Sequence, residues 1–273
     1  MSAARTIDVT HRAAGRRPAR DTRTFWRVLL AVIAPLPGVA LAVANLLSPS
    51  ANNANSDAQL NAILAHPGRV EAGMWIGVLF LLGLFPAIVA VLWVCRRHAP
   101  RLTAVVGCIT LLGAAAGLSI PNSQLPDFVA SQKGLDPRTI LTLNDNLAKL
   151  PVVLITTLLF LLGVVLFGRI LLGVLLWRSG VAPRWMASAL ILAGPLDVFA
   201  PSTLGVNNGG GALSWVLTAV GFAAASRALL RMSNDEFDLP AATTGTNDNL
   251  QPAAFDAAKP IIADALPASL KQS

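Results

Sequence analysis

The sequence predicts an all-α polytopic integral membrane protein, built as a six-helix transmembrane bundle, and three observations lead to this fold class. First, 54% of the 273 residues are apolar and only 13% are charged, whereas soluble domains average about 25% charged residues. Second, the mean hydropathy is +0.62. Third, the apolar residues fall into charge-poor runs of about 20 residues, the length that a helix needs to cross about 30 Å of hydrocarbon. So short a chain cannot bury this much apolar surface inside itself, so most of that surface must face lipid.

The same composition excludes three other classes of protein. A soluble enzyme would carry more charge, a disulfide-framework domain would carry more than the two cysteines present, and a disordered protein would be far less apolar. The apolar runs are expected to be helices, because a backbone in lipid must satisfy its own hydrogen bonds. A β-barrel would need short segments of alternating polarity, which the sequence lacks.

The apolar runs define six expected spans. Arg169 is the only charge in the fourth run, and the fifth run is the weakest because Pro195 and Asp197 interrupt it. Five spans is therefore the alternative. The six spans cover residues 28–47, 72–95, 102–120 and 150–177, then a segment that begins after Arg184, and a segment from residues 209–211 to residues 227–231.

The distribution of basic residues predicts the orientation. Seven arginines precede the first span, and seven more occupy the second–third loop, the fourth–fifth loop and the end of the sixth span. The other loops carry only Arg69, Lys133, Arg138 and Lys149. Basic loops favour the cytoplasm, so we expect both termini there, in agreement with an even number of spans. As interfacial indoles do, six tryptophans lie within a few residues of expected span ends: Trp26, Trp75, Trp93, Trp177, Trp185 and Trp215.

Three regions follow: a basic cytoplasmic tail (residues 1–24), the transmembrane domain (25–231) and an acidic, disordered cytoplasmic tail (232–273) that has few large apolar residues. The basic tail suits anionic lipid, at about 1 kcal/mol per charge. Nucleic acid is not an expected partner, since no aromatic residues interleave these arginines. An uncleaved first anchor is favoured over a signal peptide cleaved near residues 42–44. Seventeen arginines against four lysines, with abundant alanine, indicate a bacterium and hence its plasma (inner) membrane.

Both long outer loops contain helix signals. In the first loop Ser56 can cap a turn that carries Leu60, Ile63 and Leu64 and ends at Pro67. In the second, Asp136 is in the capping position and Pro137 in the first helical position. Two interpretations stay open for the second helix, a surface-lying helix that leads into span four or a lid over an outward-facing cavity. Its apolar stripe consists of Ile140, Leu143, Leu147 and Leu150.

Asp197 is the strongest candidate for a functional residue, because an ionisable group inside the bilayer is costly. Twelve residues beyond Trp185, it lies roughly 18 Å into the membrane by helical rise. Insertion there costs about 2.5–3.5 kcal/mol, which protonation, a cationic partner or water would relieve. Alternatively, Pro195 ends the fifth helix early and leaves Asp197 in a hydrated outer turn.

Arg169 is the second intramembrane charge and the obvious partner for Asp197. However, it lies nineteen residues beyond Leu150, about 10 Å from Asp197 in depth. We therefore expect Arg169 to snorkel towards the cytoplasm instead of pairing. Arg69 and Lys149 at the outer edge match the depth of Asp197 better. Glu71, two residues from Arg69, opens the second span, where the helix dipole favours a carboxylate cap.

Proline and glycine mark further positions in the spans. Pro35, Pro37, Pro86 and Pro195 are expected to be kinks repaired by neighbouring helices; the alternative is broken helices that expose carbonyls to an ion or solute. Two pairs with GxxxG spacing, Gly73 with Gly77 and Gly113 with Gly117, are expected to pack spans two and three together, and dimerisation is the alternative.

The sequence lacks the residues that several kinds of cofactor binding and catalysis require. All three histidines, His11, His66 and His98, fall outside the spans, so paired axial ligands for a haem are not available. Cys95 and Cys108 form no metal motif and are expected to be small apolar packing residues. No paired intramembrane aspartates, serine–histidine pair or P-loop occurs. We therefore expect no cofactor, no metal and no enzymatic activity.

One inner loop and the helix after it are distinctive: residues 175–184 read Leu-Leu-Trp-Arg-Ser-Gly-Val-Ala-Pro-Arg and residues 189–194 read Ala-Leu-Ile-Leu-Ala-Gly. Together with His-Pro-Gly-Arg-Val-Glu at residues 66–71, they resemble a domain-of-unknown-function family of bacterial six-helix integral membrane proteins. The sequence departs from that family in its long tails and its lack of tyrosine. The resemblance implies the six-helix architecture and carries no settled activity.

The functional expectation is a small transport-like or regulatory membrane module without covalent chemistry. A cavity near Asp197 that opens outward and takes a small solute or ion would favour transport. A tightly packed interior would favour the alternative, a structural or partner-binding scaffold, and a membrane-embedded enzyme ranks third.

Overall fold

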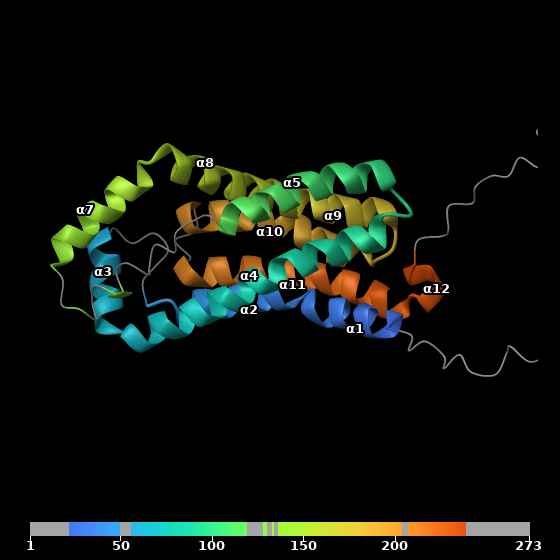
Figure 1. Ribbon diagram of the computed structural model, residues 1–273, viewed down its shortest axis with the longest axis horizontal. Coiled ribbons are helices and arrows are strands. Elements are labelled where there is room, and N and C mark those ends of the chain that lie inside the picture. Colours follow the sequence, from blue (N-terminus) through green and yellow to red (C-terminus); the bar gives the residue numbers. More distant parts are fainter. Residues whose placement is uncertain are drawn as a thin grey trace, which may run out of the picture. The chain divides into compact units, whose positions relative to one another are not determined.

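The computed structural model describes residues 22–49, 56–118, 128–129, 133, 136–203 and 207–238. The predicted fold class is confirmed, since these residues form helices and turns and contain no β-strand (Figure 1). Contacts divide the chain into two units, residues 1–232 and residues 233–273. Most of the two predicted tails, residues 1–21 and 239–273, lies outside the described residues.

The helices of the first unit lie close to the predicted runs. In chain order they are α1 (Arg23–Ile33), α2 (Leu36–Leu47), α3 (Ser56–Ala65), α4 (Pro67–Cys95), α5 (Pro100–Leu118), α7 (Pro137–Ala148), α8 (Pro151–Phe160), the π-helical segment η2 (Leu161–Leu166), α9 (Phe167–Ser179), α10 (Arg184–Thr203) and α11 (Asn207–Arg231). The second unit contributes α12 (Asn234–Phe237).

Five of the described helical stretches are long and apolar enough to cross a membrane: Arg23–Leu47, Pro67–Cys95, Pro100–Leu118, Pro151–Ser179 and Asn208–Arg231. They correspond to the predicted spans one to four and six. The predicted fifth span, α10, is not among them, and it contains both Pro195 and Asp197. Nevertheless α10 packs directly against α9 and α11. The chain is thus a polytopic helical membrane protein, and the sixth crossing stays a prediction.

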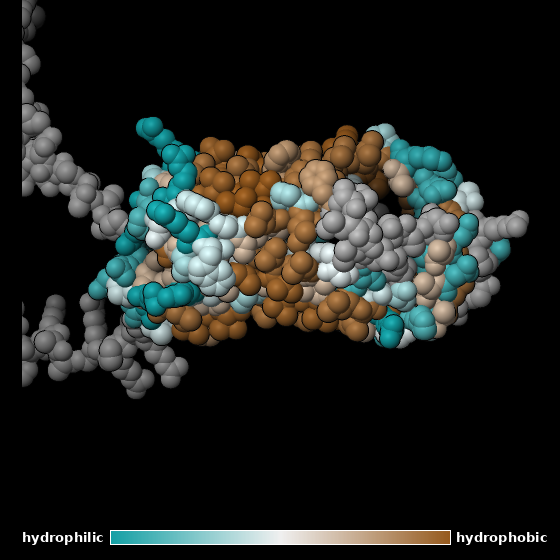
Figure 2. Space-filling view, turned by 180° about the vertical axis from the view of Figure 1, so that it is seen from behind, coloured by the Kyte–Doolittle hydropathy of each residue, from teal (hydrophilic) through white to brown (hydrophobic). Residues whose placement is uncertain are grey.

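The apolar belt of the bundle faces outward. Leu82, Leu112 and Val152 are 70%, 64% and 63% exposed, and apolar side chains cover the middle of the first unit with hydrophilic residues on either side (Figure 2). A soluble monomer rarely exposes contiguous apolar patches beyond a few hundred Å². This surface is therefore suited to acyl chains.

The first two spans differ in detail from the prediction. The first span turns at Ala34 and Pro35, so α1 and α2 are separate helices. The second span begins at Pro67, five residues before the expected start, because proline is favoured at a first helical position. Glu71 therefore lies in the second turn, and the expectation that it caps this helix was wrong.

The two glycine pairs have different surroundings. A Cβ atom on Gly113 would lie 2.8 Å from the Cα atom of Gly163, so α5 packs closely against η2 of the fourth span. A Cβ atom on Gly73 or Gly77 would meet nothing within 4 Å. The expectation that both pairs join spans two and three was wrong, since one pair joins spans three and four and the other faces outward. Dimerisation through Gly73 and Gly77 stays untested.

The fourth span changes its helical form at its middle. Leu161–Leu166 form one π-helical segment between α8 and α9. The carbonyl of Gly163 lies so close to Gly168 that a Cβ atom there would overlap it. A π-turn inside a long α-helix is uncommon and frequently marks a functional site. Arg169 lies three residues after this segment, in the first turn of α9.

Helices are present in both of the predicted loop positions, α3 with Ser56 as its first residue and α7 with Asp136 as its N-cap. A carboxylate oxygen of Asp136 accepts a hydrogen bond from the Thr139 backbone N–H at 3.2 Å, and Pro137 occupies the first turn of α7. The stripe on α7 is only partly covered: Ile140 is buried, whereas Leu143 is 50% exposed. α7 ends before Pro151 begins α8, and α7 also contacts α3.

Candidate functional site

The candidate site is built around Arg169, which is only 1% exposed in the interior of the bundle. It lies in the first turn of α9, immediately after the π-helical segment. A charge removed from water costs several kcal/mol unless hydrogen bonds and a counter-charge compensate it. The surroundings of the Arg169 side chain are therefore decisive for the stability of this site.

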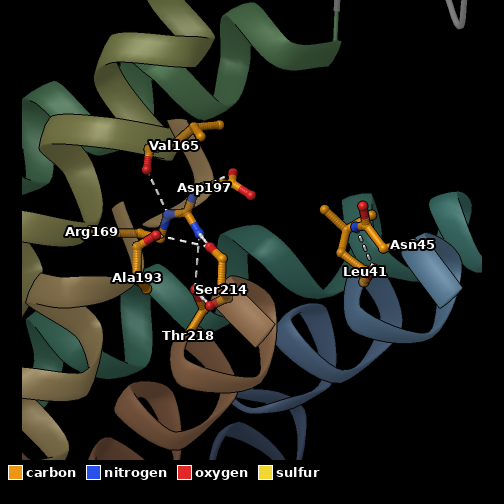
Figure 3. A network of polar contacts seen from close by, with 8 residues as sticks. All are labelled: Leu41, Asn45, Val165, Arg169, Ala193, Asp197, Ser214 and Thr218. Atoms are coloured by element: carbon orange, nitrogen blue, oxygen red, sulfur yellow. Dashed lines mark hydrogen bonds and ion pairs between the residues drawn. The ribbon is translucent and has the colours of Figure 1, made fainter. Parts of the chain in front are cut away.

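Asp197 of α10 supplies the counter-charge. The Nη2 atom of Arg169 donates to the Oδ2 atom of Asp197 at 2.6 Å, in a charge-assisted hydrogen bond (Figure 3). The Arg169 side chain is 2% exposed and the Asp197 side chain 16%. The ion pair is consequently buried at its arginine end and partly open at its aspartate end.

Three further acceptors complete the hydrogen bonding of the guanidinium. Its Nε donates to the carbonyl of Val165 at 2.6 Å, and its Nη1 donates to the Ser214 hydroxyl at 2.8 Å and the Thr218 hydroxyl at 3.1 Å. Ser214 and Thr218 are four residues apart on α11, so they share one face. The network thus joins η2, α9, α10 and α11, as Figure 3 shows.

The two hydroxyl groups are held in position by backbone carbonyls. Ser214 donates to the carbonyl of Ala193 on α10 at 2.8 Å, and Thr218 donates to the carbonyl of Ser214 at 3.0 Å. Each hydroxyl therefore donates its proton to a backbone carbonyl, and its oxygen accepts a hydrogen bond from Arg169. These bonds make both side chains acceptors for the guanidinium, which suits a permanent cation at this position.

An aromatic ring covers one side of the guanidinium. The Cζ atom of Arg169 lies 4.4 Å from the ring centroid of Trp215, in cation–π geometry. Trp215 itself is 5% exposed and packs edge-on against Phe80 with the centroids 5.4 Å apart. The expectation that Trp215 belongs to the interfacial belt was wrong. Trp26, Trp75, Trp177 and Trp185, by contrast, are all at least 44% exposed.

The expectation that Arg169 snorkels towards the cytoplasm was wrong, and the tilt of side chains explains the error. Side chains lean towards the N-terminus of their own helix. Because α9 and α10 are successive antiparallel helices, Arg169 and Asp197 lean towards each other along the bundle axis. The bond to Val165, one turn back, fixes this lean of Arg169. A depth count by helical rise omits both the tilt and the length of the arginine.

The alternative position for Asp197, a hydrated turn after Pro195, was also wrong. α10 continues past Pro195 to Thr203, so Asp197 projects from a helix. Proline lacks one backbone donor, but neighbouring helices can satisfy the freed groups. The carbonyl that loses its donor is that of Ile191, four residues earlier, and the Ser214 bond to the Ala193 carbonyl shows that α11 donates to this stretch of α10.

The other predicted site residues are not part of this network. Arg69 and Glu71 are both exposed near the start of α4, and Lys149 is exposed after α7. None of these three is the partner of Asp197, which is Arg169. Among the residues that the structure describes, no group of three or more histidine, cysteine, aspartate and glutamate side chains could hold a metal ion.

The sequence analysis did not identify Ser214, Thr218 or Trp215 as site residues. A usable signal existed: two hydroxyl residues four apart on one face of an apolar span, with an aromatic residue between them. Hydroxyl groups inside lipid usually bond to a backbone carbonyl of their own helix. The pattern alone therefore does not identify an arginine as the partner.

The interior next to Arg169 is tightly packed. The cavity there has a volume of about 10 Å³ and includes Thr110, Trp215, Thr218 and Phe222 in its lining. This is room for about one water molecule. Larger hollows of about 390 Å³ and 470 Å³ lie against α2 and α4 and against α5 and η2, respectively, and their walls are almost wholly apolar. The arginine end of the network is therefore enclosed, and the larger spaces suit acyl chains.

Comparison with known proteins adds the following. A family model described as a domain of unknown function (DUF4386) matches residues 27–230. These residues contain α2 to α10 and almost all of α11, and with them every member of the Arg169 network. No curated protein and no solved structure matches the chain.

Proposed function

Because the chain belongs to the DUF4386 family, whose description names no activity, we propose its function from its own geometry. It is a regulatory membrane module of the bacterial plasma membrane, and the Arg169–Asp197 pair is its switch. The pair acts as a latch that holds α9, α10 and α11 together. A proton or a small cation that reaches Asp197 releases the latch. The module carries out no covalent chemistry.

The observation that carries this proposal is the buried ion pair that joins α9 to α10. One guanidinium bonds to side chains of α10 and α11 at the same time. A buried pair of this kind contributes little net stability compared with apolar residues of similar volume, so its best-attested use is to specify or switch an arrangement. Two alternative arrangements of packed helices are what a membrane switch requires.

The asymmetry of burial supports a trigger at Asp197. Its side chain is 16% exposed while that of Arg169 is 2% exposed. The carboxylate is therefore the more accessible of the two charged groups. Once the carboxylate is neutral, the guanidinium keeps only uncharged acceptors in a medium where an unbalanced charge is costly. The helices then gain free energy by an arrangement that exposes Arg169 to water.

Two alternatives have some support. Transport of a small solute or ion requires a pathway, and the cavity of about 10 Å³ beside Arg169 admits none of solute size. Transport would thus depend on a second conformation opened by the same latch. A structural scaffold is supported by the tight packing, but it gives no role to a charge pair where apolar residues would pack as well.

The switch predicts a pH-dependent opening that removal of both charges abolishes. In wild-type protein, acidification should lower the protection factors (intrinsic divided by observed exchange rate) of amide hydrogens in α10 and the first half of α11 at least about tenfold, the equivalent of about 1.4 kcal/mol. Emission of Trp215, which contacts the guanidinium, should change in parallel. The measurement is hydrogen exchange with mass spectrometry in lipid nanodiscs at a series of pH values from 8 down to roughly 4, with each observed rate compared with the intrinsic rate at the same pH.

The matched variant for this experiment is R169M/D197L, which removes both charges and keeps similar volumes. It should show no acid-induced change in these helices. An equal response in this variant would show that another group titrates, and would overturn the switch. Flux of an ion or solute through wild-type proteoliposomes, absent with the double variant, would favour transport instead.

For the topology we propose six crossings, with both termini in the cytoplasm and α10 as the fifth span. Its packing between two membrane-length helices supports this count. Topology reporters fused after residues 53, 132 and 205 should report the outer side. Reporters after residues 98, 181 and 248 should report the cytoplasm. If α10 does not cross, positions 205 and 248 exchange sides while the other four keep theirs.

A further inference from the structure

A hollow of about 470 Å³ lies between α5 and the middle of the fourth span. Two buried glycines line it, Gly113 of α5 and Gly163 of η2, and a Cβ atom on either would lie 2.8–2.9 Å from the Cα atom of the other. Three larger lining residues, Leu112, Leu159 and Phe167, are 64%, 52% and 51% exposed. The glycines therefore form the floor of this space, the α5–η2 hollow, and the larger side chains form its rim.

We propose that the α5–η2 hollow binds one acyl chain of a membrane phospholipid. Its walls are almost wholly apolar, and its exposed rim belongs to the outward-facing apolar belt of the bundle. The hollow is thus continuous with the surface that meets lipid. An unfilled space deprives the atoms that line it of their dispersion contacts, so a hydrocarbon chain that enters the hollow restores those contacts.

The size of the hollow fits a single hydrocarbon chain better than a helix of a second copy. An apolar cavity of about 150 Å³ takes one benzene molecule, so a volume of about 470 Å³ takes roughly 18 carbon atoms. Along the fourth span the hollow extends from Leu159 to Leu171, roughly 18 Å by helical rise. A helix with its side chains is about 10–12 Å wide. Such a helix would rest on the rim and leave the glycine floor uncovered.

An arginine on the same helix face provides a contact for the phosphate. Leu171 and Arg178 are seven residues apart on α9, which places them on one face of the helix, with Arg178 about 10 Å nearer the end of the span. Arg178 is exposed, and so is its neighbour Trp177, whose indole favours the depth of the headgroups. A guanidinium binds phosphate oxygens through two parallel hydrogen bonds. One phospholipid can therefore place its phosphate at Arg178 and one of its chains in the hollow.

The bound chain also covers part of the π-helical segment. Leu162 and Gly163 of η2 line the hollow, so the chain packs against these residues on the side that faces lipid. Neither Arg169 nor Asp197 lines the hollow. The proposed lipid site therefore does not depend on the proposed switch.

The test uses a phosphatidylglycerol with a photoreactive diazirine in the middle of one acyl chain, added to the full chain in phosphatidylcholine nanodiscs. Mass spectrometry of the crosslinked peptides should find the label concentrated on α5 and on residues 159–171. L159W places an indole in the hollow and should lower this labelling about tenfold, the equivalent of about 1.4 kcal/mol. The matched control is L154W, since Leu154 is 53% exposed on the same helix and lines neither large hollow. Equal thermal midpoints of the two variants check the fold.

A second variant tests the phosphate contact. R178Q should lower labelling of the hollow about fivefold, at about 1 kcal/mol for one charge near the surface, whereas R231Q at the end of α11 should not. A diacylglycerol with the same photoreactive chain has no phosphate, so R178Q should leave its labelling unchanged.

Three results would overturn the proposal. The first is label spread evenly along the apolar belt, and the second is an equal decrease in L159W and L154W. The third is a dimer of the wild-type chain in native mass spectrometry that L159W alone dissociates, because the occupant would then be a second copy. Equal labelling in R178Q and R231Q would overturn the assignment of the phosphate to Arg178.

Discussion

Replacing Asp197 with asparagine is expected to lower the free energy of unfolding by about 3–5 kcal/mol, because Arg169 then stays charged and buried without a counter-charge. Asparagine keeps the size and one oxygen acceptor of the native residue, so the decrease in the free energy of unfolding reports the contribution of the negative charge. The free energy can be obtained from reversible unfolding in mixed detergent micelles, followed by circular dichroism at 222 nm.

Two control variants separate this effect from a general sensitivity of the bundle. D145N neutralises an exposed aspartate on α7 and should change stability by less than about 0.5 kcal/mol. R169M/D197L removes both charges and should recover most of the loss, as apolar replacements of buried pairs do. If D197N unfolds at the same denaturant concentration as wild type, Arg169 has another counter-charge or access to water.

The second large effect is expected at the contact between α5 and η2. G113L should prevent correct folding or lower the free energy of unfolding by about 3 kcal/mol, the upper range for inserted core volume. A Cβ atom on Gly113 would approach the Cα and carbonyl carbon of Gly163 to 2.8 Å and 2.9 Å. Backbone atoms cannot move aside as a flexible side chain can, so the two helices must separate.

G77L is the matched control for this prediction, since the residue type, the GxxxG spacing and the membrane environment are shared. A Cβ atom on Gly77 would meet nothing within 4 Å. Monodisperse yield on size exclusion and the thermal midpoint in micelles should therefore stay near wild type. A G113L protein as stable as G77L would mean that α5 and η2 lie farther apart. If instead G77L dissociates an oligomer, the dimerisation alternative for this outward-facing pair is supported.

The sequence was sufficient for the fold class because membrane helices follow from composition and length. Runs without charge must be helical in lipid, and Pro137 and Asp136 mark a helix start by local rules. The sequence does not predict the features that depend on contacts between helices. The bounds of the second span moved because Arg69 and Glu71 lie inside a helix that extends beyond the apolar run. The partner of a GxxxG face cannot be known before the helices are packed.

The candidate site was predicted in part. The sequence singles out Asp197 and Arg169 as candidate intramembrane charges, because the cost of a charge in lipid is visible in the sequence, and the structure places their side chains in contact. Their pairing was missed, since a count of helical rise treats each residue as a point on a straight rod. Ser214 and Thr218 were missed because a hydroxyl in lipid bonds well to its own backbone. Only the contact between α9 and α11 identifies them as ligands of a cation.

The π-helical segment also sets the rotational phase of the second half of the fourth span. A π-turn arises when a helix accommodates one extra residue, and one residue corresponds to roughly 100° of rotation about the axis. Arg169 lies three residues after Leu166, so its direction around the helix axis includes this rotation. A deletion of one residue within Leu161–Leu166 would restore a regular α-helix and swing the guanidinium away from Ser214 towards the acyl chains. The position of a single insertion thus decides whether this charge is tolerated inside the membrane.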